Sequence, residues 1–156
     1  MSVQDWFQRL TVSSGNMYQE EESEKWIGEW MENRAVRDEM VISTKYTMVH
    51  RRDSGKQAPG TFIAANYQGN GRKSLMLSVE SSLRKLRTTY LDIVGASFLH
   101  GVYADLSQLY IHHWDFTTSI PELMRSLDCL VRERKVLYLG ISNTPAWIVS
   151  KANECM

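Results

Sequence analysis

Short apolar runs alternate with longer amphipathic segments along most of this chain, and this alternation limits its possible folds more than any other feature. Runs typical of strands occupy residues 40–46, 90–93, 109–112 and 136–142. The first and last of these have the continuous apolar, β-branched character of strands buried on both faces of a sheet. Because helical periods separate the runs, the sequence predicts an α/β fold with parallel strands and right-handed crossover helices.

The helical segments carry their own signals. Residues 20–34 place Trp26, Ile27, Trp30 and Met31 on one stripe, and we interpret the acidic run 20–24 as helix-start chemistry rather than a metal site. Residues 73–87 repeat leucine or valine at helical spacing. Residues 119–134 begin with Ser119 as a plausible N-cap and Pro121 in the first turn, and Pro145 opens a last helix.

Two stretches show no such signals. Residues 1–17 have no sustained helical or strand period. Residues 47–72 are polar and contain two turn sequences, Ala58-Pro59-Gly60 and Gly69-Asn70-Gly71. A connection of this length without a regular period is typical of a functional or mobile loop.

The charge balance argues against several classes of partner. The 18 basic and 18 acidic side chains cancel to a formal net charge of zero, so we expect no nucleic-acid partner and no membrane partner. No apolar run approaches the roughly 18 residues of a spanning helix, and the first ten residues do not resemble a signal peptide. We therefore expect a cytoplasmic protein. Cys129 and Cys155 lack metal-ligand spacing, which predicts free thiols and no metal site.

Several long blocks of the chain resemble one family. They are NMYQEEESEKWIGEWM, VISTKYT, SVESSLRKLRTTYLDI, LYIHHWDFTTSIPELM and KVLYLGISNTPAWIVSKAN, which fall between residues 16 and 153. In these blocks the chain is similar to the aldo-keto reductases, within them to the fungal aryl-alcohol dehydrogenase and norsolorinic acid reductase branch. The resemblance implies a (β/α)8 TIM barrel that uses NADPH to reduce aldehydes and ketones, so that small-molecule carbonyls or alcohols are the expected substrates and NADP the expected cofactor.

The resemblance also implies site residues. Members carry an Asp, Tyr, Lys and His set at the carboxyl ends of the barrel strands, and by position the last three are Tyr18, Lys45 and His112. Ser142 and Asn143 match the pair that hydrogen-bonds the nicotinamide carboxamide. The Asp is missing, because its position holds Ser13.

The chemistry of carbonyl reduction explains why each of these residue types is needed. Tyr18 would donate the proton, with its pKa lowered by the Lys45 ammonium, and a neutral His112 would orient the carbonyl. Ser13 can hydrogen-bond the ammonium but cannot neutralise it, so we expect a rate loss on the order of 10² to 10⁴.

An insertion sets the chain apart from the family pattern. Members run directly from a segment like TTYLDI into LYIHHWD, whereas residues 94–108 are interposed here. Every Val codon begins with GT and one of the two Gln codons, CAG, ends in AG, so our hypothesis is that this segment is an in-frame retained intron. We predict that it leaves the sheet.

The ends of the chain also depart from the family. The first strand and helix of the barrel are not evident before Tyr18, and the chain stops after the helix that follows Ser142 and Asn143. We therefore expect residues 1–156 to form a single truncated domain, about half of a barrel that normally takes roughly 250 residues. Two functions stay open: an NADPH-dependent reductase of an aryl aldehyde or secondary-metabolite carbonyl, and a truncated non-catalytic remnant, a pseudoenzyme or mispredicted gene product, without cofactor binding.

Overall fold

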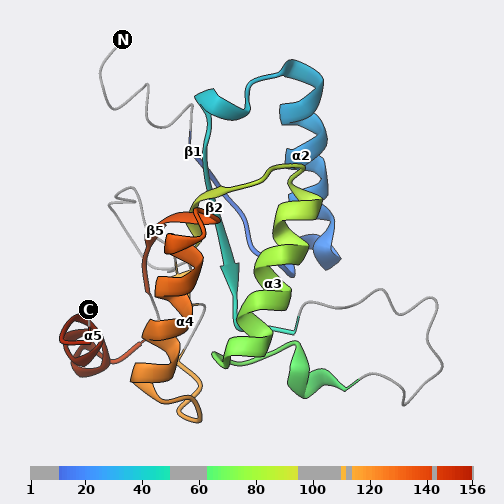
Figure 1. Ribbon diagram of the computed structural model, residues 1–156. Helices are drawn as coiled ribbons and strands as arrows, with labels where there is room; N and C mark the ends of the chain where they lie inside the picture. Colours follow the sequence, from blue (N-terminus) through green and yellow to red (C-terminus); the bar gives the residue numbers. More distant parts are fainter. Residues whose placement is uncertain (1–10, 50–62, 95–109, 112–113, 142–143, 156) are drawn as a thin grey trace.

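The computed structural model describes residues 11–49, 63–94, 110–111, 114–141 and 144–155 of the chain. Strands and helices alternate along it, as Figure 1 shows. The strands are β1 (Thr11–Ser13), β2 (Val41–Tyr46), β3 (Leu91–Val94), β4 (Tyr110–Ile111) and β5 (Val136–Leu139). The α-helices are α2 (Glu22–Arg34), α3 (Arg72–Lys85), α4 (Ile120–Arg132) and α5 (Ala146–Asn153), with short 3-10 turns η1 (Tyr18–Glu21), η2 (Arg37–Glu39) and η3 (Ala64–Asn66).

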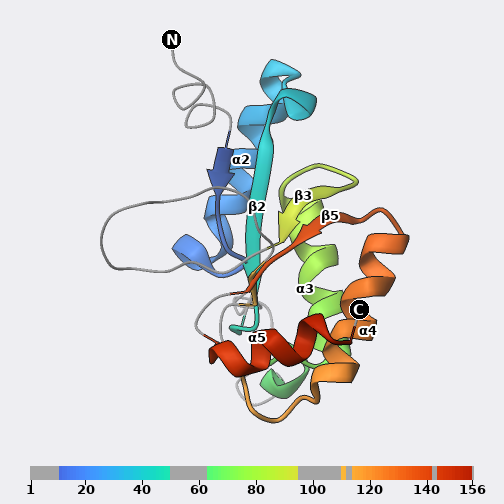
Figure 2. The same cartoon turned by 90° about the vertical axis from the view of Figure 1, so that its left-hand side faces the viewer.

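The strands form one sheet in the order β1-β2-β3-β5, with β4 also paired to β2. Every pairing in the described sheet is parallel. Helices α2, α3 and α4 lie along one side of the sheet in Figures 1 and 2. The predicted α/β architecture with parallel strands and crossover helices is therefore confirmed, and it is consistent with part of a TIM barrel.

Strands β3 and β4 bind consecutive positions of β2. Ile93 and Val94 pair with Ser43 and Thr44, and Tyr110 then pairs with Lys45. The register passes from one segment to the other without a gap on β2, although 15 residues of sequence (95–109) separate Val94 from Tyr110. Strands β3 and β4 therefore act as two pieces of a single strand that runs along one edge of β2. The prediction that 94–108 leaves the sheet is wrong for Val94, which belongs to β3 and pairs with Thr44; residues 95–109 lie outside the described part, so for them it stays a prediction.

The core gathers around β2 and β3. Ile42, Leu91 and Ile93 are fully or almost fully buried, and they pack with the apolar faces of α3 and α4. The predicted helix faces are confirmed there: Leu75, Val79, Leu86, Leu123, Leu127 and Leu130 are all buried. Ser119 is the N-cap of α4, where its Oγ accepts a hydrogen bond from the Glu122 amide, with Pro121 in the first turn.

The structure differs from the sequence interpretation mainly at the strand on the sheet edge. Residues 11–13 form β1, which pairs with β2 over Thr11–Ser13, and a strand of three residues is too short to show the sustained period that residues 1–17 lack. The prediction that the last strand is buried on both faces is wrong. Strand β5 is not buried on both faces, since Leu137 is 45% and Tyr138 65% exposed. It pairs only with β3 among the described strands, so it stands at the sheet edge.

The apolar stripe predicted for the first helix is also wrong in part. Met31 is buried and Ile27 packs against the core, but Trp26 is 58% and Trp30 41% exposed. Helix α2 turns Gly28 toward α3 instead, and a Cβ at Gly28 would lie 2.3 Å from the Lys85 carbonyl oxygen. The small residue therefore lets the two helix backbones approach closely, which moves the indole rings away from the contact.

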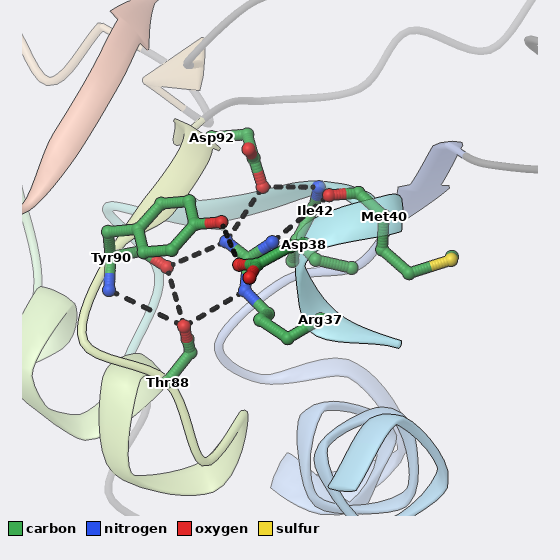
Figure 3. Close-up of polar contacts among 7 residues, drawn as sticks. All are labelled: Arg37, Asp38, Met40, Ile42, Thr88, Tyr90 and Asp92. Atoms are coloured by element: carbon green, nitrogen blue, oxygen red, sulfur yellow. Dashed lines mark hydrogen bonds and ion pairs between the residues drawn. The ribbon is translucent and has the colours of Figure 1, made fainter. Parts of the chain in front are cut away.

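Arg37 joins β2 to β3 at their amino ends (Figure 3). Its Nη2 donates to Asp92 Oδ2 at 2.8 Å and to the Tyr90 carbonyl oxygen at 2.9 Å, and its Nε donates to Thr88 at 2.9 Å. The guanidinium also lies 3.9 Å from the centre of the Tyr90 ring. Asp92 Oδ2 accepts in turn from the Ile42 amide at 2.9 Å. One arginine thus fixes the start of two strands.

Replacing Arg37 with glutamine should destabilise the fold, because the Asp92 carboxylate and the carbonyl oxygens of Met40 and Tyr90 lose their charged donor. We expect the free energy of unfolding to fall by about 2 to 3 kcal/mol, measured by urea denaturation. The matched control is Arg84→Gln on the exposed side of α3, which should change stability by less than about 0.5 kcal/mol. Equal effects of the two substitutions would contradict this role for Arg37.

Deleting residues 94–108 should stabilise the sheet, because it joins β3 and β4 into one continuous strand in the observed register. Removing the loop-closure cost of this segment is worth on the order of 2 kcal/mol, read as a higher urea midpoint. The control deletes residues 94–107, which shifts the following residues by one position and turns their side chains to the opposite face. If both deletions have the same stability, the single-strand interpretation is wrong.

Candidate active site

A lysine, a tyrosine and a serine from three elements meet near the carboxyl end of β2. Lys45, the last residue but one of β2, donates from Nζ to the Tyr18 hydroxyl at 2.9 Å and to Ser13 Oγ at 3.3 Å. The same Nζ lies 4.5 Å from the centre of the Tyr18 ring. Ser13 ends β1 and Tyr18 begins η1. The structure therefore brings together three of the positions that the sequence selected, including the serine that stands in place of the family's Asp.

The backbone directly after Tyr18 adopts an uncommon conformation. Gln19, Glu20 and Glu21 all have positive φ, at 51°, 56° and 76°. Residues other than glycine in this region cost of order 1 kcal/mol each, and such residues cluster at functional sites. The turn directs the chain from the Tyr18 position into α2.

A buried polar network holds the segment before Tyr18 against β2. Glu24 is fully buried; its carboxylate accepts from the Thr44 hydroxyl and pairs with Lys85 Nζ at 2.7 Å. Lys85 Nζ also donates to the Asn16 carbonyl oxygen at 3.0 Å. Asn16 and Thr44 are close neighbours of Tyr18 and Lys45 in sequence, so the network sets the distance between the two segments.

This network adds to one sequence interpretation. The acidic run 20–24 does stand at a helix start, with Glu22 and Glu24 in the first turn of α2, but Glu24 is also a buried partner of Lys85. A signal was present in the sequence, because Glu24 lies four residues before Gly28 on the face of α2 that contacts α3.

Burial sets the protonation behaviour of the pair. Lys45 is 2% exposed, and desolvation lowers its pKa to about 8. Desolvation raises the pKa of Tyr18. The shift of the Tyr18 pKa is thus opposite to the lowering expected from the Lys45 ammonium, because burial removes water from around the phenol.

The other predicted site residues fall outside the described part of the chain. His112 directly follows β4, and Ser142 and Asn143 directly follow Ile141. Their assignment as carbonyl-orienting and carboxamide-binding residues, like the catalytic assignment of Tyr18 and Lys45, stays a prediction.

A groove of about 590 Å³ opens beyond the end of β2, and the sequence analysis did not find it. It is lined by Thr47, Gly69, Gly71, Asp115 and Thr117, among others. Asp115 closes the groove from the loop before α4. Its Oδ2 accepts from the Asn70 amide at 2.7 Å, and its own amide donates to Asn70 Oδ1 at 2.8 Å.

The reciprocal contact joins the loops that precede α3 and α4. Burial alone would raise the pKa of Asp115, but hydrogen bonds from Asn70, Thr117 and Thr118 outweigh it and lower the pKa. The Asp115 carboxylate therefore stays ionised, and it gives the groove a negative charge.

Comparison with known proteins agrees with a parallel α/β sheet that carries a lysine and a tyrosine at a strand end. Residues 8–156 match the aldo/keto reductase family. The chain is 49% identical over 142 residues to a norsolorinic acid reductase of Aspergillus flavus, which covers 91% of this chain and 31% of that protein. It is 47% identical over 144 residues to an aryl-alcohol dehydrogenase [NADP(+)] of Phanerodontia chrysosporium, covering 92% of this chain and 33% of the relative.

The chain belongs to the aldo/keto reductase family. It spans about a third of the length of the curated relatives that it matches. In the described residues, no helix is long and apolar enough to cross a membrane, and no group of three or more His, Cys, Asp or Glu side chains could hold a metal ion.

The lowered pKa of Lys45 predicts a specific pH dependence of stability. A lysine that binds its proton less tightly when folded than when unfolded reduces stability below its folded pKa, and the loss is relieved as the pH rises from about 8 toward the unfolded value. The free energy of unfolding of the native chain, minus that of Lys45→Met, should therefore increase between about pH 7 and 10, by at most about 3 kcal/mol. Urea denaturation of both proteins across this range measures it, and a flat difference would contradict the burial of the charge.

Proposed function

We propose that this chain supplies the proton-donating tyrosine and its lysine to the NADPH-dependent reduction of an aryl aldehyde or a secondary-metabolite carbonyl. The observation that carries the proposal is the contact of 2.9 Å between Lys45 Nζ and the Tyr18 hydroxyl at the carboxyl end of β2. Parallel α/β barrels place their chemistry at this end of the sheet. The relatives named as a norsolorinic acid reductase and an aryl-alcohol dehydrogenase suggest the substrate class.

The two side chains have separate tasks in this proposal. Tyr18 holds a proton on its hydroxyl oxygen, within reach of a substrate oxygen that gains charge as the carbonyl is reduced. The Lys45 hydrogen bond and the Glu24 network fix the direction of the phenol. Because burial raises the Tyr18 pKa, the phenol stays protonated at neutral pH but is a weaker acid than an exposed tyrosine.

The described residues do not fit a whole dinucleotide. NADPH would supply the hydride when bound, and its pyrophosphate requires basic side chains or free helix N-termini. Among the described residues, the lining of the groove beyond β2 includes no lysine or arginine and carries the Asp115 carboxylate. A pyrophosphate would therefore meet a like charge there.

This mismatch favours a second candidate for the isolated chain, a non-catalytic remnant of a reductase. Ser13 in place of a carboxylate points the same way, because a hydroxyl cannot balance the Lys45 charge. The two candidates differ in whether residues 1–156 alone bind the cofactor and turn over a carbonyl.

The first test is cofactor binding. We expect NADPH to bind no tighter than about millimolar, because neutral hydrogen bonds to a carboxamide contribute only about 0.5 to 1.5 kcal/mol each. A fluorescence titration of NADPH with the chain measures the affinity. Micromolar binding would show that a phosphate site exists outside the described residues, and it would reject the remnant.

The second test concerns the proton donor. If the chain reduces a benzaldehyde with NADPH, Tyr18→Phe should lower kcat by about 10² or more, since removal of a positioned general acid removes that much. Tyr138→Phe is the matched control, because this tyrosine is 65% exposed at the sheet edge and should leave the rate unchanged. Activity that survives Tyr18→Phe would mean that another group donates the proton.

A further inference from the structure

Lys45 has no carboxylate partner among the residues that the structure describes. All of its polar contacts are neutral, namely the Tyr18 hydroxyl at 2.9 Å and Ser13 Oγ at 3.3 Å. The other half-buried cations of the described residues are paired with carboxylates: Lys85 with Glu24 and Glu21, Arg37 with Asp92, Lys25 with Glu22 and Lys135 with Glu133. An ammonium without a counter-ion in a dehydrated site is the arrangement that favours a free amine.

The charged groups on the elements around Lys45 are all engaged elsewhere. Glu24 of α2 is held by Lys85 and Thr44. Asp92 of β3 pairs with Arg37 near the amino end of β2. Asp115 accepts from Asn70, Thr117 and Thr118. None of these carboxylates is within ion-pair distance of the Lys45 amine, so none restores its charge.

We propose that Lys45 is an imine-forming lysine, which captures an aldehyde covalently and without any cofactor. The proposal uses the same site as the carbonyl reduction but does not depend on it, because no hydride is involved. It rests on the neutral contacts of Nζ, one of which is to Ser13, an exposed residue at the end of β1.

The step balances with the groups present. The Nζ lone pair attacks the aldehyde carbon, and the carbonyl oxygen takes the Tyr18 proton to give a carbinolamine. The nitrogen returns a proton to the Tyr18 phenolate, and the carbinolamine hydroxyl then leaves as water with that proton while a carbon–nitrogen double bond forms. The resulting iminium gives its remaining N–H proton to the Tyr18 phenolate, which restores the phenol and leaves a neutral imine. One aldehyde and one amine give one imine and one water, with no change in oxidation state. The phenol 2.9 Å from Nζ is placed to serve these proton transfers.

The amine has the protonation behaviour that the step needs. Burial brings the pKa of Lys45 to about 8, and relative to an exposed lysine this gives on the order of 10² more free amine at neutral pH. Exposed lysines such as Lys73 and Lys151 are the internal comparison within the same chain.

The experiment is reductive trapping. The full chain is incubated with benzaldehyde and sodium cyanoborohydride at several pH values, without NADPH, and the benzylated lysines are located and quantified by peptide mass spectrometry. We expect Lys45 to be labelled at least about tenfold faster than Lys73 or Lys151. The labelling rate should increase with an apparent pKa near 8. Uniform labelling of all lysines, or no label on Lys45, overturns the proposal.

A matched pair of variants isolates the missing charge. Ser13→Asp places a carboxylate beside Nζ, which favours the ammonium and should slow Lys45 labelling about tenfold or more at pH 7. Ser13→Asn has nearly the same shape without the charge and should label like the native chain, with circular dichroism confirming the fold of both. Equal rates for the two variants would overturn the proposal.

If Ser13→Asp does not fold, the pH profile of Lys45 in the native chain decides alone. Tyr18→Phe keeps the amine but removes the proton relay, so it should slow labelling while leaving the Lys45 pKa profile in place. A failure of NADPH binding leaves all of these readouts intact, so the two proposals fail separately.

Discussion

Parallel pairing along β2 is the constraint on which the rest of this structure depends. This strand binds β1 on one side and β3 with β4 on the other, and five of its six residues are buried. A strand covered on both faces and both edges has one register open to it, because a shift by one residue would turn Lys45 into the opposite face. The position of the amine beside Tyr18 and Ser13 therefore follows from backbone hydrogen bonds rather than from the side chains of the site.

Much of the fold could be predicted from the sequence, because the elements that pack most tightly leave the clearest periods. The leucine and valine spacing of α3 and the capping serine and proline of α4 indicate these helices within one or two residues. The elements that were missed lie where local pattern and final burial differ. A three-residue β1 is too short to show a period, and the apolar residues of β5 lie at an edge where their hydrophobicity does not lead to burial.

For the candidate site, too, the sequence predicts some features and misses others. The motifs place Tyr18, Lys45 and Ser13 in the right elements, and the structure brings them together. The sequence could not give the direction of the pKa shifts, since these depend on how much water each group loses and on which carboxylates are engaged elsewhere. It also concealed Glu24 inside an acidic run, although this carboxylate is the fully buried member of the network that holds the Tyr18 segment.

The division of one strand between β3 and β4 has a consequence for the order of folding. Both segments bind β2, but β4 is the shorter segment and pairs across a somewhat longer stretch of chain, from Lys45 to Tyr110 rather than from Thr44 to Val94, so its contact is expected to form later. The β1, β2 and β3 pairings can assemble first, and β4 then completes the end of β2 that holds Lys45. The part of the molecule that carries its chemistry would then be the last to become ordered and the first to open in hydrogen exchange.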